Sequence, residues 1–301
     1  MVTLNSNETY KEFLAYDSSK PSYQHVFPLI EQSFEFGDFV GFIGNFTPQA
    51  VERLKRCPLV ADIEEDIQIM AFEATLQPDA PRHLARLSQK EKLESHESMS
   101  YCYENDTRVK VNAYIIDSGV NGEHYEFQGR VVQGADFTNE GPGDQNGHGT
   151  HVAGLVGSST YGSAKDANII EVKALNKNGA GTLSGIISAI EFAATHRKEQ
   201  GVPGVANLSL GSIINTALNK AVDSAYDTGL IIVAAAGNSN TNACFTSPAG
   251  ANKAITVGAI NDENDELAEF TNWGRCIDIN APGVEIESVH FENEESSAIL
   301  T

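Results

Sequence analysis

The sequence predicts an α/β domain with a mostly parallel sheet, preceded by a small α+β unit. From about residue 109 onward, strand-like apolar runs alternate with helix-like runs, which favours a sheet with helices packed on its faces. The clearest run, 230–236 (LIIVAAA), is apolar throughout, as expected for a strand buried on both faces. A polar stretch with two prolines, 73–81, is interpreted as a linker, so we expect domains over 1–77 and 78–301.

The first unit has the pattern of a short mixed fold. Its expected strands are 39–43, 59–63 and 67–72. Thr47 is a suitable N-cap, and Pro48 fits the first helical position, so a helix should start there and stop before Pro58.

The second domain repeats strand, loop and helix several times. Its expected strands are 111–116, 168–175, 205–210, 230–236 and 254–259. The expected helices are 184–195 and 217–226, and another begins near residue 148. In parallel sheets of this kind, ligands bind beyond the carboxyl ends of the strands.

The charge of the chain restricts its partners. It has 41 acidic and 20 basic residues, a formal charge of −21, which argues against a nucleic-acid partner because phosphate contacts need clustered Lys and Arg. No apolar run reaches the length of a membrane span, and the polar first residues do not read as a signal peptide.

The four cysteines show no zinc-type spacing and do not predict a metal site. Cys244 and Cys276 could form a disulfide, but their separation in sequence leaves the pairing open.

The chain is organised around residues 144–154 (DQNGHGTHVAG), where His148 lies between glycines at the start of an apolar helix. Alone, this histidine could simply cap a helix. Two further polar residues follow strands: Asp117 closes 111–116, and Asn238 follows 230–236. Alone, each could be a turn residue. His151 shares a helix face with His148, so a zinc-binding pair is conceivable. The HExxH pattern of such pairs is absent, however, and we interpret His151 as structural.

Together, these three residues suit acyl-transfer chemistry. A buried aspartate can hold an imidazole in one tautomer, a neutral histidine can act as general base, and an asparagine amide can donate to an oxyanion. The expected catalytic residues are therefore Asp117, His148 and Asn238.

Several motifs resemble those of the subtilisin-like serine proteases, within the fungal proteinase K and cerevisin branch. They are 117–119 (DSG), 148–154 (HGTHVAG), 207–211 (NLSLG), 235–238 (AAGN) and 281–283 (APG). The resemblance implies a three-layer catalytic domain and a ferredoxin-like propeptide that inhibits the enzyme, assists its folding and is cleaved off between 72 and 80. It implies Asp117 as orienting acid, His148 as general base and Asn238 as oxyanion donor.

The resemblance also assigns the residues that contact a protein or peptide substrate. Those expected to line the cleft are Ser209, Leu210, Gly211, Gly179, Ala180, Gly181, Ala235, Ala236 and Gly237. The resemblance implies that no cofactor is required. The resemblance makes calcium possible at Asp278 with the carbonyls of Asn252 and Ala254, and it implies a secretory-pathway, vacuolar or extracellular location.

The family's nucleophile lies in a Gly-Thr-Ser-Met-Ala motif, which this sequence lacks. We expect that motif, and the buried helix it begins, just past Thr301, so that part of the sheet would lie uncovered. No serine of the chain is expected to replace it; the serines considered are Ser118, Ser209, Ser247, Ser296 and Ser297. The chain is interpreted either as part of an active serine endopeptidase precursor or as an inactive peptide-binding protein. A third interpretation is an inhibitor or chaperone acting through the first unit.

Overall fold

The computed structural model describes residues 1–5, 9–66, 74–94, 99–104 and 110–301. The chain divides into two compact units, Met1–Ala71 and Phe72–Thr301. The strand expected over 67–72 lies outside the described residues.

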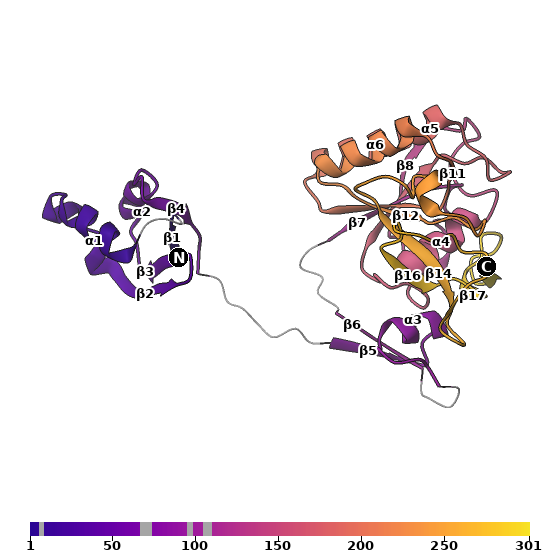
Figure 1. Ribbon diagram of the computed structural model, residues 1–301, viewed down its shortest axis with the longest axis horizontal. Helices are drawn as coiled ribbons and strands as arrows, with labels where there is room; N and C mark the ends of the chain where they lie inside the picture. The colour runs from indigo at the N-terminus through magenta and orange to yellow at the C-terminus, as the bar shows by residue number, and fades with distance from the viewer. Residues whose placement is uncertain (6–8, 67–73, 95–98, 105–109) are drawn as a thin grey trace. The chain divides into compact units, whose positions relative to one another are not determined.

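The first unit is a four-stranded antiparallel sheet with two helices (Figure 1). Its elements are β1 (Val2–Leu4), α1 (Tyr10–Ser18), η1 (Ser22–Gln24), η2 (Phe27–Leu29), β2 (Ile30–Phe36), β3 (Phe39–Gly44), α2 (Pro48–Leu54) and β4 (Val60–Ile63). The strand order β2-β3-β1-β4 and the βαββαβ succession make the unit ferredoxin-like.

Local capping explains both helices of this unit. The Thr47 hydroxyl accepts from Ala50 N at 3.3 Å with Pro48 in the first turn, as expected. Helix α1 was not anticipated, although Thr9 and Glu12 form a capping box that the sequence displays.

The second unit has a mostly parallel sheet in the order β15-β14-β12-β10-β7-β9-β8, with β16 beside β14. Its strands are β5 (Ala74–Pro78), β6 (Ser100–Glu104), β7 (Asn112–Asp117), β8 (Val131–Asp136), β9 (Asn168–Lys173), β10 (Gly204–Leu208), β11 (Ser212–Ile213), β12 (Ile231–Ala235), β13 (Thr246–Ser247), β14 (Ile255–Asn261), β15 (Glu266–Leu267), β16 (Ile279–Pro282), β17 (Ile286–Val289) and β18 (Ser297–Leu300). Its helices are α3 (Arg82–Leu87), η3 (Tyr125–Phe127), α4 (His148–Gly157), α5 (Leu183–Gln200), α6 (Thr216–Asp227) and η4 (Ala243–Phe245).

Helices cover both faces of this sheet, which gives three layers. Helices α5 and α6 lie side by side and share a core with Tyr114 and Ile116 of β7 (Figure 1). The alternate β7 residues, Ala113 and Ile115, face the opposite way and share a core with Ala153 of α4. The predicted α/β class is confirmed, and α5 extends five residues beyond its predicted end at 195.

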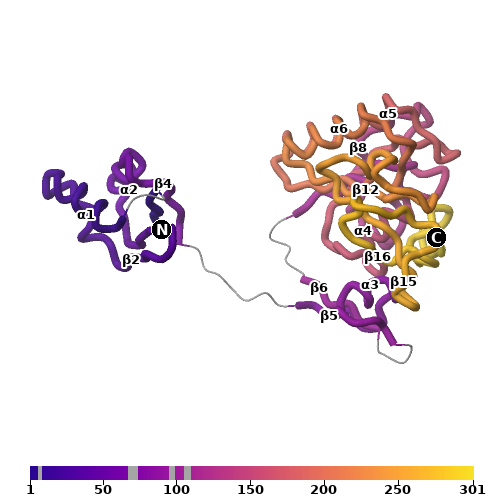
Figure 2. Tube along the Cα trace, viewed as in Figure 1, coloured from indigo at the N-terminus to yellow at the C-terminus, as the bar shows by residue number. Residues whose placement is uncertain are grey.

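The linker expected over 73–81 is wrong for most of its length. Residues 74–78 form β5, which pairs antiparallel with β6, and Pro81 precedes α3. This segment is bound to the rest of the second unit: Arg86 makes a bidentate pair with Asp265, both contacts at 2.9 Å (Figure 2 shows α3 near β15). The polar composition concealed a hairpin whose two strands lie more than twenty residues apart.

The expectation that 230–236 is buried on both faces is also wrong. Ile232 and Ala234 of β12 are buried, but Ile231 is 42% exposed on the other face, as is Ile255 of β14. Among the described residues, α4 covers the β7 and β9 side of that face. The β12 and β14 part of this face is therefore partly exposed among the described residues.

Candidate active site

Asp117 and His148 lie together where β7 ends and α4 begins. Asp117 Oδ1 is 2.7 Å from His148 Nδ1, and the same oxygen accepts from Ser118 N at 2.7 Å. Asp117 is fully buried, whereas the His148 side chain is 42% exposed. The arrangement is a buried carboxylate that orients an imidazole at the surface of a cavity.

Two glycines make this contact possible. Gly147 caps α4 with φ +101°, a left-handed conformation that few other residues adopt. A Cβ on Gly149 would lie 2.2 Å from the carbonyl oxygen of Gly119. The first turn of α4 therefore packs directly on the loop after Asp117, as the glycine-framed motif predicted.

The environment raises the pKa of His148. The hydrogen bond to Asp117 raises the pKa of His148 above its ordinary value, burial opposes the change, and the charges of Asp117 and Asp144 add to it. A histidine held in this way accepts a proton more readily and keeps one tautomer, as a general base requires.

His151 has a different environment. It is 5% exposed, its Nε2 is 3.0 Å from the carbonyl oxygen of Ile286, and burial lowers its pKa. These contacts agree with the structural role that we expected for it.

Asn238 lies in the loop after β12 and lines a cavity of about 550 Å³ together with His148 and Thr301. Its amide has no hydrogen-bond partner among the described residues, so it is free to donate to a ligand. Its loop is held by Asn272, which is 2% exposed. Asn272 Nδ2 donates to Ala236 O at 2.8 Å, and Oδ1 accepts from Ser239 N at 3.1 Å and from Thr241 N at 3.0 Å.

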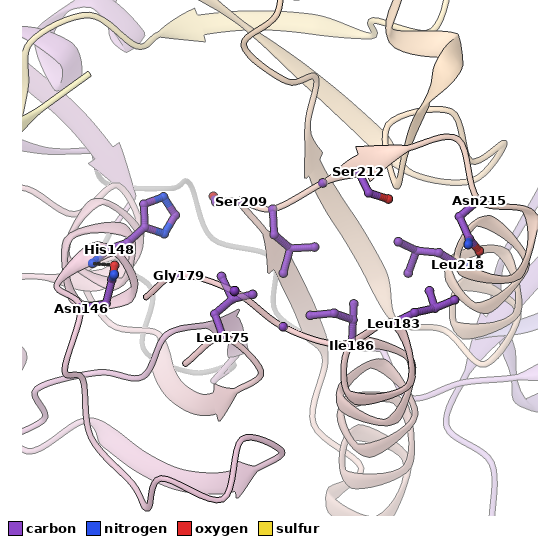
Figure 3. Close-up of a pocket in the computed structure, with 14 residues that line it drawn as sticks. Asn146, His148, Leu175, Gly179, Leu183, Ile186, Ser209, Ser212, Asn215 and Leu218 are labelled. Carbon is purple, nitrogen blue, oxygen red and sulfur yellow. Dashed lines mark hydrogen bonds between the residues drawn. The ribbon is translucent and has the colours of Figure 1, made fainter. Parts of the chain in front are cut away.

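A second cavity, of about 510 Å³, extends away from His148 (Figure 3). It is lined by six of the nine expected substrate-binding residues: Gly179, Ala180, Gly181, Ser209, Leu210 and Gly211. In Figure 3, the segment at Gly179 and the segment from Ser209 to Ser212 flank the cavity, with Ile186 and Leu218 at its far end.

The other three expected residues do not line this cavity. Ala235 ends β12, Ala236 is buried with Ala243 and Ala249, and Gly237 faces the Asn272 amide. Sequence reasoning in turn missed apolar residues that line the cavity: Leu175, Leu183, Ile186 and Leu218. Leu175, Ile186 and Leu218 lie in expected strands and helices and Leu183 lies just outside one, and nothing in the sequence pattern distinguished these residues as lining a cavity.

The serines considered as substitutes have other partners. Ser118 Oγ bonds Asp144, Ser209 Oγ bonds Asn207, Ser247 Oγ bonds Asn215, Ser296 Oγ bonds His290 and Ser297 Oγ bonds Glu287. Among the described residues, none of these hydroxyls bonds His148.

The structure joins Cys244 to Cys276 in a disulfide, the pairing that the sequence left open, and leaves Cys57 and Cys102 free. At the expected calcium position, Asp278 Oδ2 accepts from Thr256 N at 2.8 Å. The described part of the chain contains no group of three or more His, Cys, Asp or Glu side chains that could hold a metal ion.

Comparison with known proteins identifies the family. The family model Peptidase_S8, the subtilase family, matches residues 109–300. The chain is 43% identical to the subtilase-type proteinase RRT12 of Saccharomyces cerevisiae, over 99% of this chain and 67% of that protein. It is 42% identical to cerevisin of the same yeast, over 90% of this chain and 44% of that protein.

A solved structure agrees with these relatives. The crystal structure of a cold-adapted subtilisin-like serine proteinase matches with a TM-score of 0.66 and 40% identity, over 74% of this chain and 79% of the other. The chain thus spans about two thirds of the first relative's length and under half of cerevisin's. On the family model, the relatives and the shared fold, the chain belongs to the subtilase family.

Proposed function

We propose that this chain is part of a serine endopeptidase in which Asp117 and His148 serve a serine that is not among residues 1–301. The observation that carries the proposal is the 2.7 Å contact between Asp117 Oδ1 and His148 Nδ1 at the end of the substrate-sized cavity. His148 and Asn238 line one cavity, so the proposed general base and the proposed oxyanion donor face the same space.

In the proposed reaction, the serine oxygen attacks the scissile carbonyl carbon and its proton passes to His148 Nε2. Asp117 stabilises the resulting imidazolium, and the Asn238 amide donates to the oxyanion. The C–N bond then breaks as His148 returns the proton to the leaving amine. Water then attacks the carbonyl carbon of the acyl-enzyme ester while His148 takes its proton. The ester C–O bond breaks, His148 returns the proton to the serine oxygen, and the carboxylic acid product is released. The apolar end of the cavity, with Leu183, Ile186 and Leu218, favours an apolar substrate side chain.

The decisive test starts with the natural transcript beyond the codon for Thr301. If an in-frame Gly-Thr-Ser-Met-Ala motif follows, the natural protein should be labelled by a fluorophosphonate that reacts with activated serines. The variant His148→Ala should lose labelling, whereas His196→Ala, a histidine bound to Tyr114 instead, should keep it. A natural protein that carries the serine but is not labelled contradicts the proposal.

The alternative from another class is an inactive peptide-binding protein. Two observations favour it: residues 1–301 form the cavity by themselves, and the hydroxyls of Ser118 and Ser209 bond Asp144 and Asn207 rather than His148. Extended peptides would then bind residues 1–301 by strand addition along 209–211. Isothermal titration with an apolar pentapeptide tests this: binding that Ile186→Asp abolishes supports it, and no binding contradicts it.

We further propose that the ferredoxin-like unit Met1–Ala71 is an inhibitory propeptide of the second unit. The support is its separate core, built on Phe13, Phe42 and Leu54. The isolated unit should inhibit a related subtilase. Absence of inhibition at high concentration would argue against the role.

Calcium and location complete the proposal. A calcium ion at Asp278 would take most of its oxygen ligands from backbone carbonyls and water, because one carboxylate is present. Added calcium should raise Tm, and Asp278→Asn should abolish the rise; no rise refutes the site.

The disulfide supports an oxidising compartment, in the secretory pathway, the vacuole or outside the cell. Among the described residues, none of the helices has both the length and the apolar character needed to cross a membrane.

A further inference from the structure

Strand β9 carries two buried charged side chains that the proposed reaction does not use. Lys173 is fully buried and Glu171 is 5% exposed. Within the described residues, Lys173 forms no ion pair with a carboxylate. A buried charge is costly unless its hydrogen bonds are made, so the partners of these two side chains indicate what the charges stabilise.

Both side chains bind the loops on either side of the Asp117–His148 pair. Lys173 Nζ donates to Ser118 O at 2.9 Å and to Gly143 O at 2.8 Å. Glu171 Oε1 accepts from Gly143 N at 2.7 Å and from Val120 N at 3.2 Å. The N–H and the C=O of Gly143 are therefore both held by β9, next to the loop that follows Asp117.

The Gly143 anchor continues to His148 through Asp144. Asp144 Oδ1 accepts from Asn146 N and Gly147 N, each at 2.9 Å, and Oδ2 accepts from Thr150 N at 2.9 Å. These three amides bracket His148 on both sides. Asp117, the partner of His148, is also adjacent to β9, because Asp117 of β7 lies opposite Lys173 of β9 in the parallel pairing.

We propose that Glu171 and Lys173 are positioning residues that hold the His148 loop against the end of the Asp117 strand and thereby set the Nδ1–Oδ1 contact. Only the catalytic role of that contact rests on the proposed function; the contact itself is formed within residues 1–301. A positioning role and a purely electrostatic role of Lys173 predict opposite changes in the pKa of His148 when Lys173 is replaced. As a nearby positive charge alone, Lys173 would lower the pKa of His148, so its removal would raise that pKa. As a clamp, its removal loosens the bond to Asp117 and lowers the pKa.

The test is NMR titration of His148 in residues 1–301 and in Lys173→Met, which keeps the length of the side chain and removes its donors. We expect the pKa of His148 to fall toward the ordinary histidine value and the downfield Nδ1 proton signal to be lost. The matched control is Lys165→Met, because Lys165 Nζ also donates to two backbone carbonyls, of Ser159 and Thr160, away from the site. It should leave both signals unchanged.

A rise or no change of the pKa in folded Lys173→Met overturns the proposal, as does an equal fall in the control. If Lys173→Met does not fold, Glu171→Gln and Glu171→Met replace it. The glutamine retains an acceptor for Gly143 N and should preserve the His148 signals, whereas the methionine should lose them; equal behaviour of the two contradicts the clamp. None of these measurements uses peptidase activity, so an inactive natural protein would refute the proposed function and leave this inference intact.

Discussion

Replacing Gly149 by alanine tests how tightly the His148 helix is packed on the Asp117 loop. A Cβ at this position would meet Gly119 O at 2.2 Å and Asp117 Cβ at 3.1 Å, whereas ordinary contacts begin at 3.4 Å. The obstructing oxygen belongs to the backbone, and the Gly119 loop has little room to shift, because a Cβ on Gly119 would itself lie 2.3 Å from Gly143 O. The Gly119 loop therefore cannot make room for the new Cβ, and we expect the first turn of α4 to move away from Asp117.

The expected cost follows from two opposing effects. Overpacking of this kind costs about 1–3 kcal/mol. Alanine gains up to about 1 kcal/mol over glycine in a helix, which offsets part of that cost. Because the clash involves backbone atoms, we expect Gly149→Ala to lower the free energy of unfolding by about 2 kcal/mol. The same displacement should weaken the Asp117–His148 contact.

Urea unfolding followed by tryptophan fluorescence measures this cost. Trp273 is the single tryptophan of the chain and lies in the second unit, so its signal reports that unit alone. The control is Gly185→Ala in the first turn of α5, where the nearest atom to the new Cβ is the Thr182 hydroxyl at 3.1 Å. That variant should change stability far less. A Gly149→Ala protein as stable as the wild type, with His148 still bonded to Asp117, would refute the packing argument.

Three further predictions concern groups around the site and the N-terminal segment of the second unit. Because the pKa of His148 is raised, its bond to Asp117 stabilises the fold fully below the ordinary value of about 6.5 and loses this contribution as the pH rises through the folded pKa. Asp117→Asn should remove that pH-dependent component from urea unfolding curves; an unchanged difference between pH 5 and pH 9 contradicts it. Arg86→Met should cost about 1 kcal/mol in the same assay, since its pair with Asp265 is partly exposed; no loss would mean that the segment is held by other contacts. Asn272→Leu should cost about 3 kcal/mol and deprotect the amides of the loop after β12 in hydrogen exchange; protection equal to wild type would contradict its bracing role.

The positions of the two principal site residues could be predicted because each is marked locally. Asp117 ends an apolar β-branched strand, and His148 stands between glycines that only a tight helix start requires. Parallel strands carry their carboxyl ends to one edge of the sheet, so strand ends far apart in sequence converge there. This rule places Asp117 at that edge, but His148 begins α4, so its pairing with Asp117 was expected from the combined chemistry of the residues and from the family motifs.

The N-terminal part of the second unit could not be predicted in the same way. The β5 and β6 strands are short and lie far apart in sequence, and their pairing is stabilised by contacts with distant residues. Tyr101 of β6 donates to Ser163 O at 2.8 Å, and Gln77 of β5 donates to Thr160 O at 3.1 Å. Nothing in the composition of 73–104 displays these partners, so polar content and prolines pointed to a linker.

The residues that hold the site were hidden for a related reason. In the β9 sequence, Glu171 and Lys173 look like the solvent-facing positions of an ordinary strand. Both are buried because β9 lies between β7 and β8, and their charges are tolerated because loops from elsewhere supply hydrogen bonds at that point. A charged residue where the pattern calls for an apolar one is expensive, so it persists where it performs a task that apolar packing cannot. Here the two side chains form hydrogen bonds with the backbone N–H and C=O of Gly143. A leucine or valine could fill the same space but could not form these bonds.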